Sequence, residues 1–160
     1  MTTWDDFAAA CPGLADRLRG RFEEHGLAFL ATLRRDGMPR ISGIEPLIAD
    51  GELWVGMMPG SRKVDDVRRD PRVALHGASI DKEVAAGDVK LTGRLVEVTD
   101  PARVARFAEA FRDANGYGPE PPFPLFTVDI LDATSLRPQG DHLEIELWSA
   151  TAGLRRMERR

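Results

Sequence analysis

Residues 27–58 have the sequence LAFLATLRRDGMPRISGIEPLIADGELWVGMM, and this stretch decides the fold class of the chain. It holds three largely apolar runs, residues 27–33, 40–49 and 52–58, separated by Asp36-Gly37 and Asp50-Gly51. Asp-Gly between apolar runs is typical of a tight hairpin turn, because glycine adopts positive φ without strain. The stretch therefore predicts three antiparallel strands that follow one another directly.

Helix signals lie on both sides of these strands. Apolar residues recur at four-residue steps between Pro12 and Gly26, which is the pattern of a capped amphipathic helix. A second helix begins after the N-cap residue Ser61 and must end before Pro71. A third spans residues 100–116, with Asp-Pro at its start and Asn-Gly at its end.

The rest of the chain adds further strands, at residues 72–79, 89–98, 126–131 and 142–148. The alternation in residues 89–98 changes phase at Val96, which predicts a β-bulge there. Six to seven antiparallel strands with three to four short helices predict a mainly β fold, a β-barrel with added helices whose closure removes the sheet edges. We expect one domain over residues 1–160.

Composition excludes several classes of function. The net charge of -4 argues against a nucleic-acid partner, which needs a basic field. Cys11 is the only cysteine, so one chain can build neither a disulfide framework nor a thiolate cluster, and the three histidines lack metal-ligand spacing. We expect no metal, no membrane partner and a cytoplasmic location, because the sequence has no signal peptide and no apolar run of about 18 residues.

Residues 58–63, MPGSRK, form the most informative motif for chemistry. They lead from a strand into a helix whose first turn carries Arg62 and Lys63. Cations are unfavourable at a helix N-terminus, where free N–H groups bind anions, so their placement favours a bound phosphate. The alternative is that both are solvated surface residues. Arg40 and Ser42 on a nearby strand could reach the same anion.

Two segments resemble the pyridoxamine 5'-phosphate oxidases. GSRKVD (60–65) with DPRVAL (70–75) resembles the family's GSRK…NPRV stretch, in which the Arg-Lys pair holds the phosphate of FMN. RISGIE (40–45) falls where the family has an Arg-led strand along the flavin, and LEIELW (143–148) resembles its closing segment. The resemblance implies an FMN-binding split barrel, a homodimer with FMN at its interface, and these cofactor-binding residues: Arg40, Ile41, Ser42, Gly43, Met57, Ser61, Arg62, Lys63 and Trp148.

The chain also departs from that family. Glu45 stands where the family has a lysine that contacts the substrate phosphate, which argues against pyridoxamine 5'-phosphate oxidase activity itself. Gly56 and Met57 replace a tyrosine-threonine pair. The tail is spaced differently, so no single arginine can be assigned to the flavin among Arg155, Arg156 and Arg159.

We therefore predict a flavin-dependent oxidoreductase with an undefined substrate and no identified catalytic side chain. The first alternative is a reductase that uses a deazaflavin, coenzyme F-420. The second is a non-catalytic protein that binds flavin or haem on the same fold. Trp148 could stack on a ligand or lie at a dimer contact, and Tyr117 could be a loop lid or a turn filler. Asp65 and Asp66 are expected to screen the cations rather than act as bases.

Overall fold

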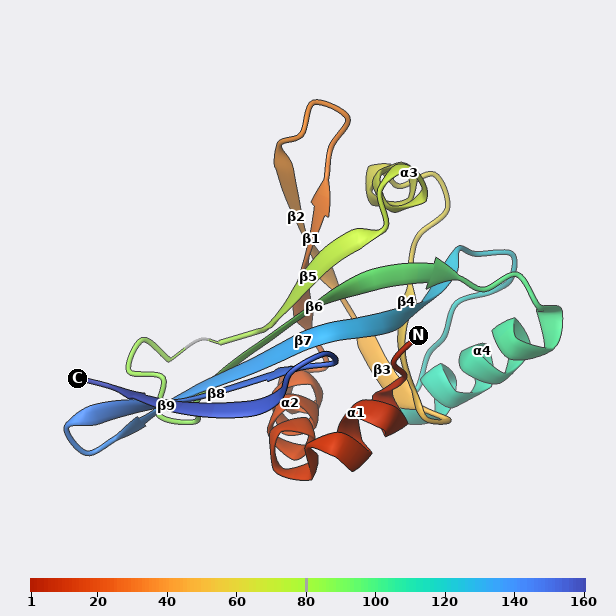
Figure 1. The fold of residues 1–160 in the computed structure, drawn as a ribbon. Coiled ribbons are helices and arrows are strands. Elements are labelled where there is room, and N and C mark those ends of the chain that lie inside the picture. The colour runs from red at the N-terminus through yellow and green to blue at the C-terminus, as the bar shows by residue number, and fades with distance from the viewer. Residues whose placement is uncertain (80) are drawn as a thin grey trace.

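The computed structural model describes residues 1–79 and 81–160 and shows a mainly β fold with added helices, as predicted (Figure 1). The helices are α1 (Trp4–Ala10), α2 (Pro12–His25), α3 (Arg62–Arg69) and α4 (Pro101–Asn115). The strands are β1 (Ala28–Leu33), β2 (Pro39–Ile44), β3 (Pro46–Ala49), β4 (Glu52–Gly56), β5 (Arg72–Gly77), β6 (Asp88–Glu97), β7 (Leu125–Gln139), β8 (His142–Ser149) and β9 (Gly153–Arg159).

All nine strands belong to one antiparallel sheet, and the long strand β7 divides it. The strand order is β2-β1-β5-β6-β7-β4-β3, while β8 pairs with β7 and β9 pairs with β8. The first residues of β7 pair with β4 and its second half pairs with β8. Within the described residues β2 and β3 are not paired, so the sheet is split and open rather than the closed barrel that the strand pattern suggests.

The predicted run of residues 40–49 is two strands rather than one. β2 pairs with β1, β3 pairs with β4, and Glu45 lies between them outside both pairings. The chain changes partner at this residue, and Pro46 follows it directly. Glu45 is therefore held at a corner between the two parts of the sheet.

The β-bulge lies at a different place from the predicted one. The register of β6 and β7 shifts between Thr92 and Gly93, where Leu131 of β7 is the extra residue. Val96 stays in regular register, so the prediction of a bulge there is wrong. The change of phase arises because β6 ends at Glu97, after which the backbone N–H of Val98 donates to Leu125 and its side chain enters a second core.

Two hydrophobic cores support the sheet. The larger lies between the sheet and the helices α1 and α2, which lie together below it in Figure 1. The smaller joins Trp54 and Leu125 to Phe107 and Phe111 of α4. The second core fixes α4 beside the end of β4, and this placement forms one wall of the site described below.

The inward face of β8 carries Glu146 and Trp148 rather than the strand's aliphatic residues. Glu146 and Trp148 are 5% exposed, whereas the alternating residues Ile145 and Leu147 are only half-buried on the other face. Glu146 is compensated by an ion pair with Arg17 of α2 and by one with Arg156 of β9. The outer face of β8 is consequently apolar.

Candidate functional site

The turn that joins β4 to α3 leaves hydrogen-bonding groups unused. Gly60 has a φ of +74°, a conformation that favours glycine, and brings the chain sharply to Ser61. Ser61 occupies the N-cap position of α3, yet its side chain makes no capping hydrogen bond. Its Oγ is buried and has no partner within the described part of the chain. The start of α3 therefore presents a free hydroxyl together with free backbone N–H groups.

The two cations of the first turn of α3 form no ion pair with any described residue, in contrast to those of its last turn. Arg68 pairs with Glu97 at 2.6 Å, and Arg69 lies 3.5 Å from a carboxylate oxygen of Asp66. Lys63 is half-buried, and burial lowers its pKa. Arg62 is exposed. An anion at this end of the helix would stabilise both charges.

Asp66 fixes Arg40 beside α3. The Arg40 Nε donates to Asp66 Oδ2 at 2.6 Å, and the Thr32 hydroxyl donates to the same oxygen at 2.9 Å. Burial alone would raise the pKa of Asp66, but the hydrogen bonds from Arg40 and Thr32 outweigh it and hold that pKa below its usual value. The same bond raises the pKa of Arg40. Asp66 thus orients a cation on β2 toward α3, a positioning role beyond the screening predicted for it.

β2 presents two different faces at this site. Arg40 and Ser42 lie on one face, opposite Thr32 and Leu30 of β1. Ile41, 74% exposed, and Gly43 lie on the other. The structure therefore brings Arg40 to α3, with Ser42 on the same face of β2, while Ile41 and Gly43 form an open strip on the outer side of the sheet.

Met57 and Trp148 lie in the main core. Met57 is 4% exposed, and its backbone N–H donates to Pro124 at 2.9 Å. Trp148 packs on Phe7 of α1, with 4.8 Å between the ring centroids. Both roles considered for Trp148 need an exposed indole, and α1, which the sequence patterns do not predict, covers it. Trp148 is a packing residue in this chain.

Arg155, Arg156 and Arg159 all lie on β9. Arg156 pairs with Glu146, while Arg155 and Arg159 lie opposite Leu147 and Leu143 of β8. Figure 1 shows β9 on the far side of the sheet from α3. Within one chain none of these arginines is brought to the start of α3.

A hollow of about 370 Å³ lies beside the β4–α3 turn. Its walls come from the turn, from the corner residue Glu45, and from α4 and the segment after it. The Tyr117 hydroxyl donates to Glu45 Oε1 across it, and this hydrogen bond raises the pKa of Tyr117. We call it the Glu45 hollow; its lining is Glu45, Gly56, Met57, Met58, Pro59, Phe107, Phe111, Tyr117, Gly118, Pro119, Glu120 and Phe123.

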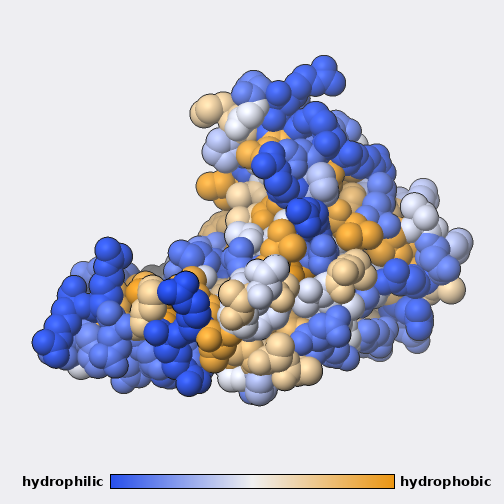
Figure 2. Space-filling model, in the orientation of Figure 1, coloured by the Kyte–Doolittle hydropathy of each residue, from blue (hydrophilic) through white to orange (hydrophobic). Residues whose placement is uncertain are grey.

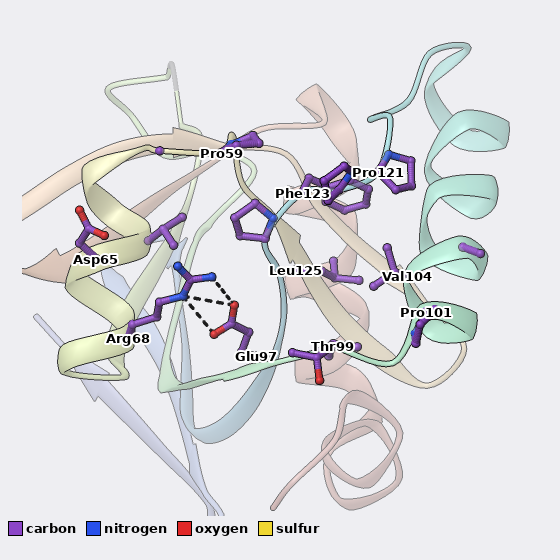
Figure 3. A pocket seen from close by; sticks show the side chains of 16 residues that line it. Pro59, Asp65, Arg68, Glu97, Thr99, Pro101, Val104, Pro121, Phe123 and Leu125 are labelled. Carbon is purple, nitrogen blue, oxygen red and sulfur yellow. Dashed lines mark hydrogen bonds and ion pairs between the residues drawn. The ribbon is translucent and has the colours of Figure 1, made fainter.

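A larger hollow, about 630 Å³, lies on the other side of Pro59 and Phe123, between α3 and α4 (Figure 3). The bidentate ion pair of Arg68 and Glu97 stands on its wall. Neither Arg62 nor Lys63 is among the described residues that line either hollow. Of these two hollows, only the Glu45 hollow is lined by the corner residue between β2 and β3, which makes it the better candidate for the reacting end of a ligand.

Two classes of site are not found in the structure. Among the described residues, no group of three histidine, cysteine or carboxylate side chains is arranged to hold a metal ion. No helix in the described part of the chain is long and apolar enough to cross a membrane.

Comparisons with known proteins agree with this architecture. A family model described as "Pyridoxamine 5'-phosphate oxidase" matches residues 14–136. No curated protein matches the chain. Among solved structures, a pyridoxamine 5'-phosphate oxidase-related, FMN-binding protein from Nostoc punctiforme PCC 73102 is 15% identical, with a TM-score of 0.66 over 94% of this chain and 96% of that one.

Two further structures show the same fold. PhzG from Burkholderia lata 383, solved with tetrahydrophenazine-1-carboxylic acid, is 12% identical, with a TM-score of 0.64 over 97% of this chain and 94% of that one. A conserved hypothetical protein from Mycobacterium tuberculosis is 20% identical, with a TM-score of 0.65 over 75% of this chain and 82% of that one. At these identities the likeness is one of fold.

Proposed function

The chain belongs to the pyridoxamine 5'-phosphate oxidase family, and from this premise we propose that it is an FMN-dependent oxidoreductase that binds FMN at the interface of a homodimer. When bound, FMN supplies a ring that accepts or donates hydride. The protein itself therefore has to bind the flavin, orient it toward the substrate and shield it from water. One observation carries the proposal: at the start of α3 lie a buried hydroxyl and two cations that have no partner among the residues that the structure describes.

The residues at the start of α3 fit a phosphate. The phosphate of FMN is an anion with several acceptor oxygens, and Ser61 Oγ, Arg62, Lys63 and the free N–H groups of α3 are all donors. The Nε of Arg40 is bound to Asp66, which leaves its two terminal nitrogens for the same anion. The site therefore contains hydrogen-bond donors that have no acceptor among the described residues.

The outer face of β2 suits a flat ring. A Cβ added at Gly43 would meet nothing within 4 Å, so the backbone there is open to close approach. Gly43 lies opposite Phe29 of β1, which is 48% exposed. An isoalloxazine placed along the backbone of residues 40–44 would lie next to the corner residue Glu45, which lines the Glu45 hollow.

Exposed apolar surface supports the dimer. Ile41 and Phe29 are 74% and 48% exposed, and Met157 of β9, opposite Ile145, is 42% exposed. Figure 2 shows hydrophobic side chains gathered where the projecting end of the sheet meets the body of the molecule. Exposed apolar side chains at the β1–β2 edge are typical of an interface, and Met157 adds a second exposed apolar residue at another edge of the sheet. A second copy would cover these side chains and close the flavin site.

The proposal is tested by titrating the purified protein with FMN, with coenzyme F-420 and with haem, while light scattering gives its mass. We expect quenching of FMN fluorescence at a stoichiometry of one per chain and the mass of a dimer. The holoprotein should then be reduced by a nicotinamide donor and reoxidised. If the protein prefers F-420, the deazaflavin takes the place of FMN in the proposal. Tight binding of a cofactor without turnover would indicate a non-catalytic binding protein, and failure to bind any of the three cofactors would refute the proposal.

A further inference from the structure

The Glu45 hollow has the size and lining of a site for a small aromatic molecule. At about 370 Å³ it lies at the lower end of the range for ligand sites. Its inner wall is an aromatic cluster in which Phe107 lies 5.6 Å from Phe111 and 5.8 Å from Phe123 between ring centroids. Phe107 and Phe111 also belong to the second core, so this wall is fixed by packing.

Gly56 at the end of β4 makes room for this wall. A Cβ added at Gly56 would lie 3.2 Å from Cζ of Phe107. The ring of Phe107 is therefore packed directly against strand backbone, and the hollow opens beyond it toward Met58 and Pro59. The rings of this apolar wall are tilted by 44° and 50° to one another, so an aromatic ligand can contact them face-on or edge-on.

The charge of the hollow is negative. Its lining contains the carboxylates of Glu45 and Glu120 and no lysine, arginine or histidine. A phosphate or carboxylate placed there would face like charge within an apolar surrounding, which is strongly unfavourable. A protonated amine would instead gain a charge-assisted hydrogen bond.

Glu45 is held ready for such a bond. It lies at the corner between β2 and β3, and the Tyr117 hydroxyl donates to its Oε1. No described residue donates a hydrogen bond to its second oxygen, Oε2. Tyr117 is 56% exposed and packs edge-on against Phe111 at 5.8 Å. The tyrosine therefore orients the carboxylate at the rim of the hollow, a role that fits a lid better than a turn filler.

We propose that the Glu45 hollow takes a small arylalkyl amine with a planar ring and without a phosphate or carboxylate group, whose protonated nitrogen binds Glu45 while its ring lies on the wall formed by Phe107, Phe111 and Phe123. The proposal rests on the proposed function for its meaning as a substrate site, since the flavin ring would lie beside this hollow. The chemistry of the lining, however, concerns this chain's own residues and holds with or without the cofactor.

The test uses three probes of the same shape, each titrated by calorimetry into FMN-loaded protein: 1-naphthylmethylamine, 1-naphthylmethanol and 1-naphthylmethyl phosphate. We expect the amine to bind at least about tenfold more tightly than the alcohol and the phosphate to bind most weakly, because one charge-assisted hydrogen bond corresponds to about tenfold or more in affinity. The visible spectrum of bound FMN gives an independent readout of ring contact.

Variants at Glu45 make the test specific. Glu45→Gln keeps an acceptor for Tyr117 but should reduce the affinity of the amine to that of the alcohol, and Glu45→Lys should reverse the order in favour of the phosphate. Glu120→Gln, at an exposed residue of the same lining, is the matched control and should change each affinity less than threefold. An unchanged preference in Glu45→Gln, or tightest binding of the phosphate by the wild type, would overturn the proposal.

The two proposals fail in different ways. The affinity for FMN is measured first and does not depend on Glu45. If FMN does not bind, the same three probes are titrated into the cofactor-free protein, where preference for the amine supports the assigned ligand class alone. If FMN binds and the preference is absent, the ligand class is wrong and the flavin site stands.

Discussion

Replacing Ser61 with alanine should have opposite effects on the free and the FMN-bound protein. An N-cap serine normally stabilises its helix by about 1 kcal/mol. Ser61 makes no capping bond, and its Oγ is buried without a partner in the described structure. A buried polar group that lacks a partner is unfavourable by about 1–3 kcal/mol. In the free protein Ser61→Ala should therefore leave the free energy of unfolding unchanged or raise it by up to about 1 kcal/mol.

The bound protein should respond in the other direction. If the hydroxyl donates to the FMN phosphate, its removal loses a charge-assisted hydrogen bond of about 1.5–3 kcal/mol, which corresponds to a rise in the Kd for FMN of about 10- to 150-fold. Urea unfolding gives the first quantity and titration of FMN fluorescence the second. Together, the free energy of unfolding and the Kd for FMN show whether the Ser61 hydroxyl binds FMN or only caps α3.

Thr3 provides the matched control. Its hydroxyl accepts from the Asp6 N–H at 3.2 Å and donates to the Asp6 carboxylate at 2.9 Å, so it does cap α1. Thr3→Ala should lower the free energy of unfolding by about 1 kcal/mol and leave the affinity for FMN unchanged. The reasoning is refuted if Ser61→Ala destabilises the free protein as much as Thr3→Ala does, or if its Kd for FMN stays within twofold of the wild type.

Three other changes test the site and the fold. Lys63→Ala should weaken FMN binding about 10- to 150-fold, while the control Arg106→Ala on α4 should leave it unchanged. Because the pKa of Lys63 is lowered, the wild type should lose affinity for FMN at high pH. Lys63→Arg should abolish that loss, because guanidinium stays protonated. Because the pKa of Asp66 is lower in the folded than in the unfolded chain, Asp66 stabilises the fold above about pH 3.9, its pKa in the unfolded chain, and this contribution is lost as pH falls through the pKa of the folded state. Asp66→Asn should therefore reduce the dependence of the free energy of unfolding on pH, measured with urea between pH 2 and 5. The same pH dependence in the wild type and the variant would contradict this prediction. Gly93→Ala would place a Cβ 2.4 Å from the Asp129 carbonyl oxygen and should lower the free energy of unfolding, measured by thermal denaturation, by about 1–3 kcal/mol. Gly20→Ala, on the exposed side of α2 with nothing within 4 Å, should raise the free energy of unfolding by about 0.5–1 kcal/mol.

Local signals predict most of the elements. Both Asp-Gly turns are present, with positive φ at Gly37 and at both Asp50 and Gly51. α2 and α4 end at Gly26 and Gly116, each in the left-handed conformation that the sequence indicates. These features depend on neighbours in the chain, which is why periodicity and turn residues suffice to predict them.

The errors come from long-range pairing. β9 has every residue exposed and no alternation, so only its pairing with β8 makes it a strand. α1 is a seven-residue helix whose one local signal is the capping box of Thr3 and Asp6. Because α1 is missing from the prediction, nothing in the sequence indicates that Trp148 and Glu146 face inward.

The candidate site divides in the same way. The cluster of Ser61, Arg62 and Lys63 can be predicted from the sequence because it is local. Arg40 is predicted as a cation on a nearby strand and again by the family resemblance. The pairing of Arg40 with Asp66 joins residues 26 positions apart and needs β1, β2 and α3 in place. An acid at a buried helix position beside Val67 is the only signal that could have indicated it.

The contact of Phe107 with the backbone of Gly56 has a consequence for how this family diverges. The space beside the end of β4 can be filled by a side chain on the strand or by one reaching across from α4, but not by both, since a single Cβ at residue 56 already lies 3.2 Å from the ring. During evolution a larger side chain at the position of Gly56 should therefore be accompanied by a smaller one at the position of Phe107, and the reverse. In an alignment of relatives, a tyrosine at the position of Gly56 should accompany a small residue at the position of Phe107, and such covariation would mark the lineages in which the shape of this hollow, and with it the choice of ligand, has changed.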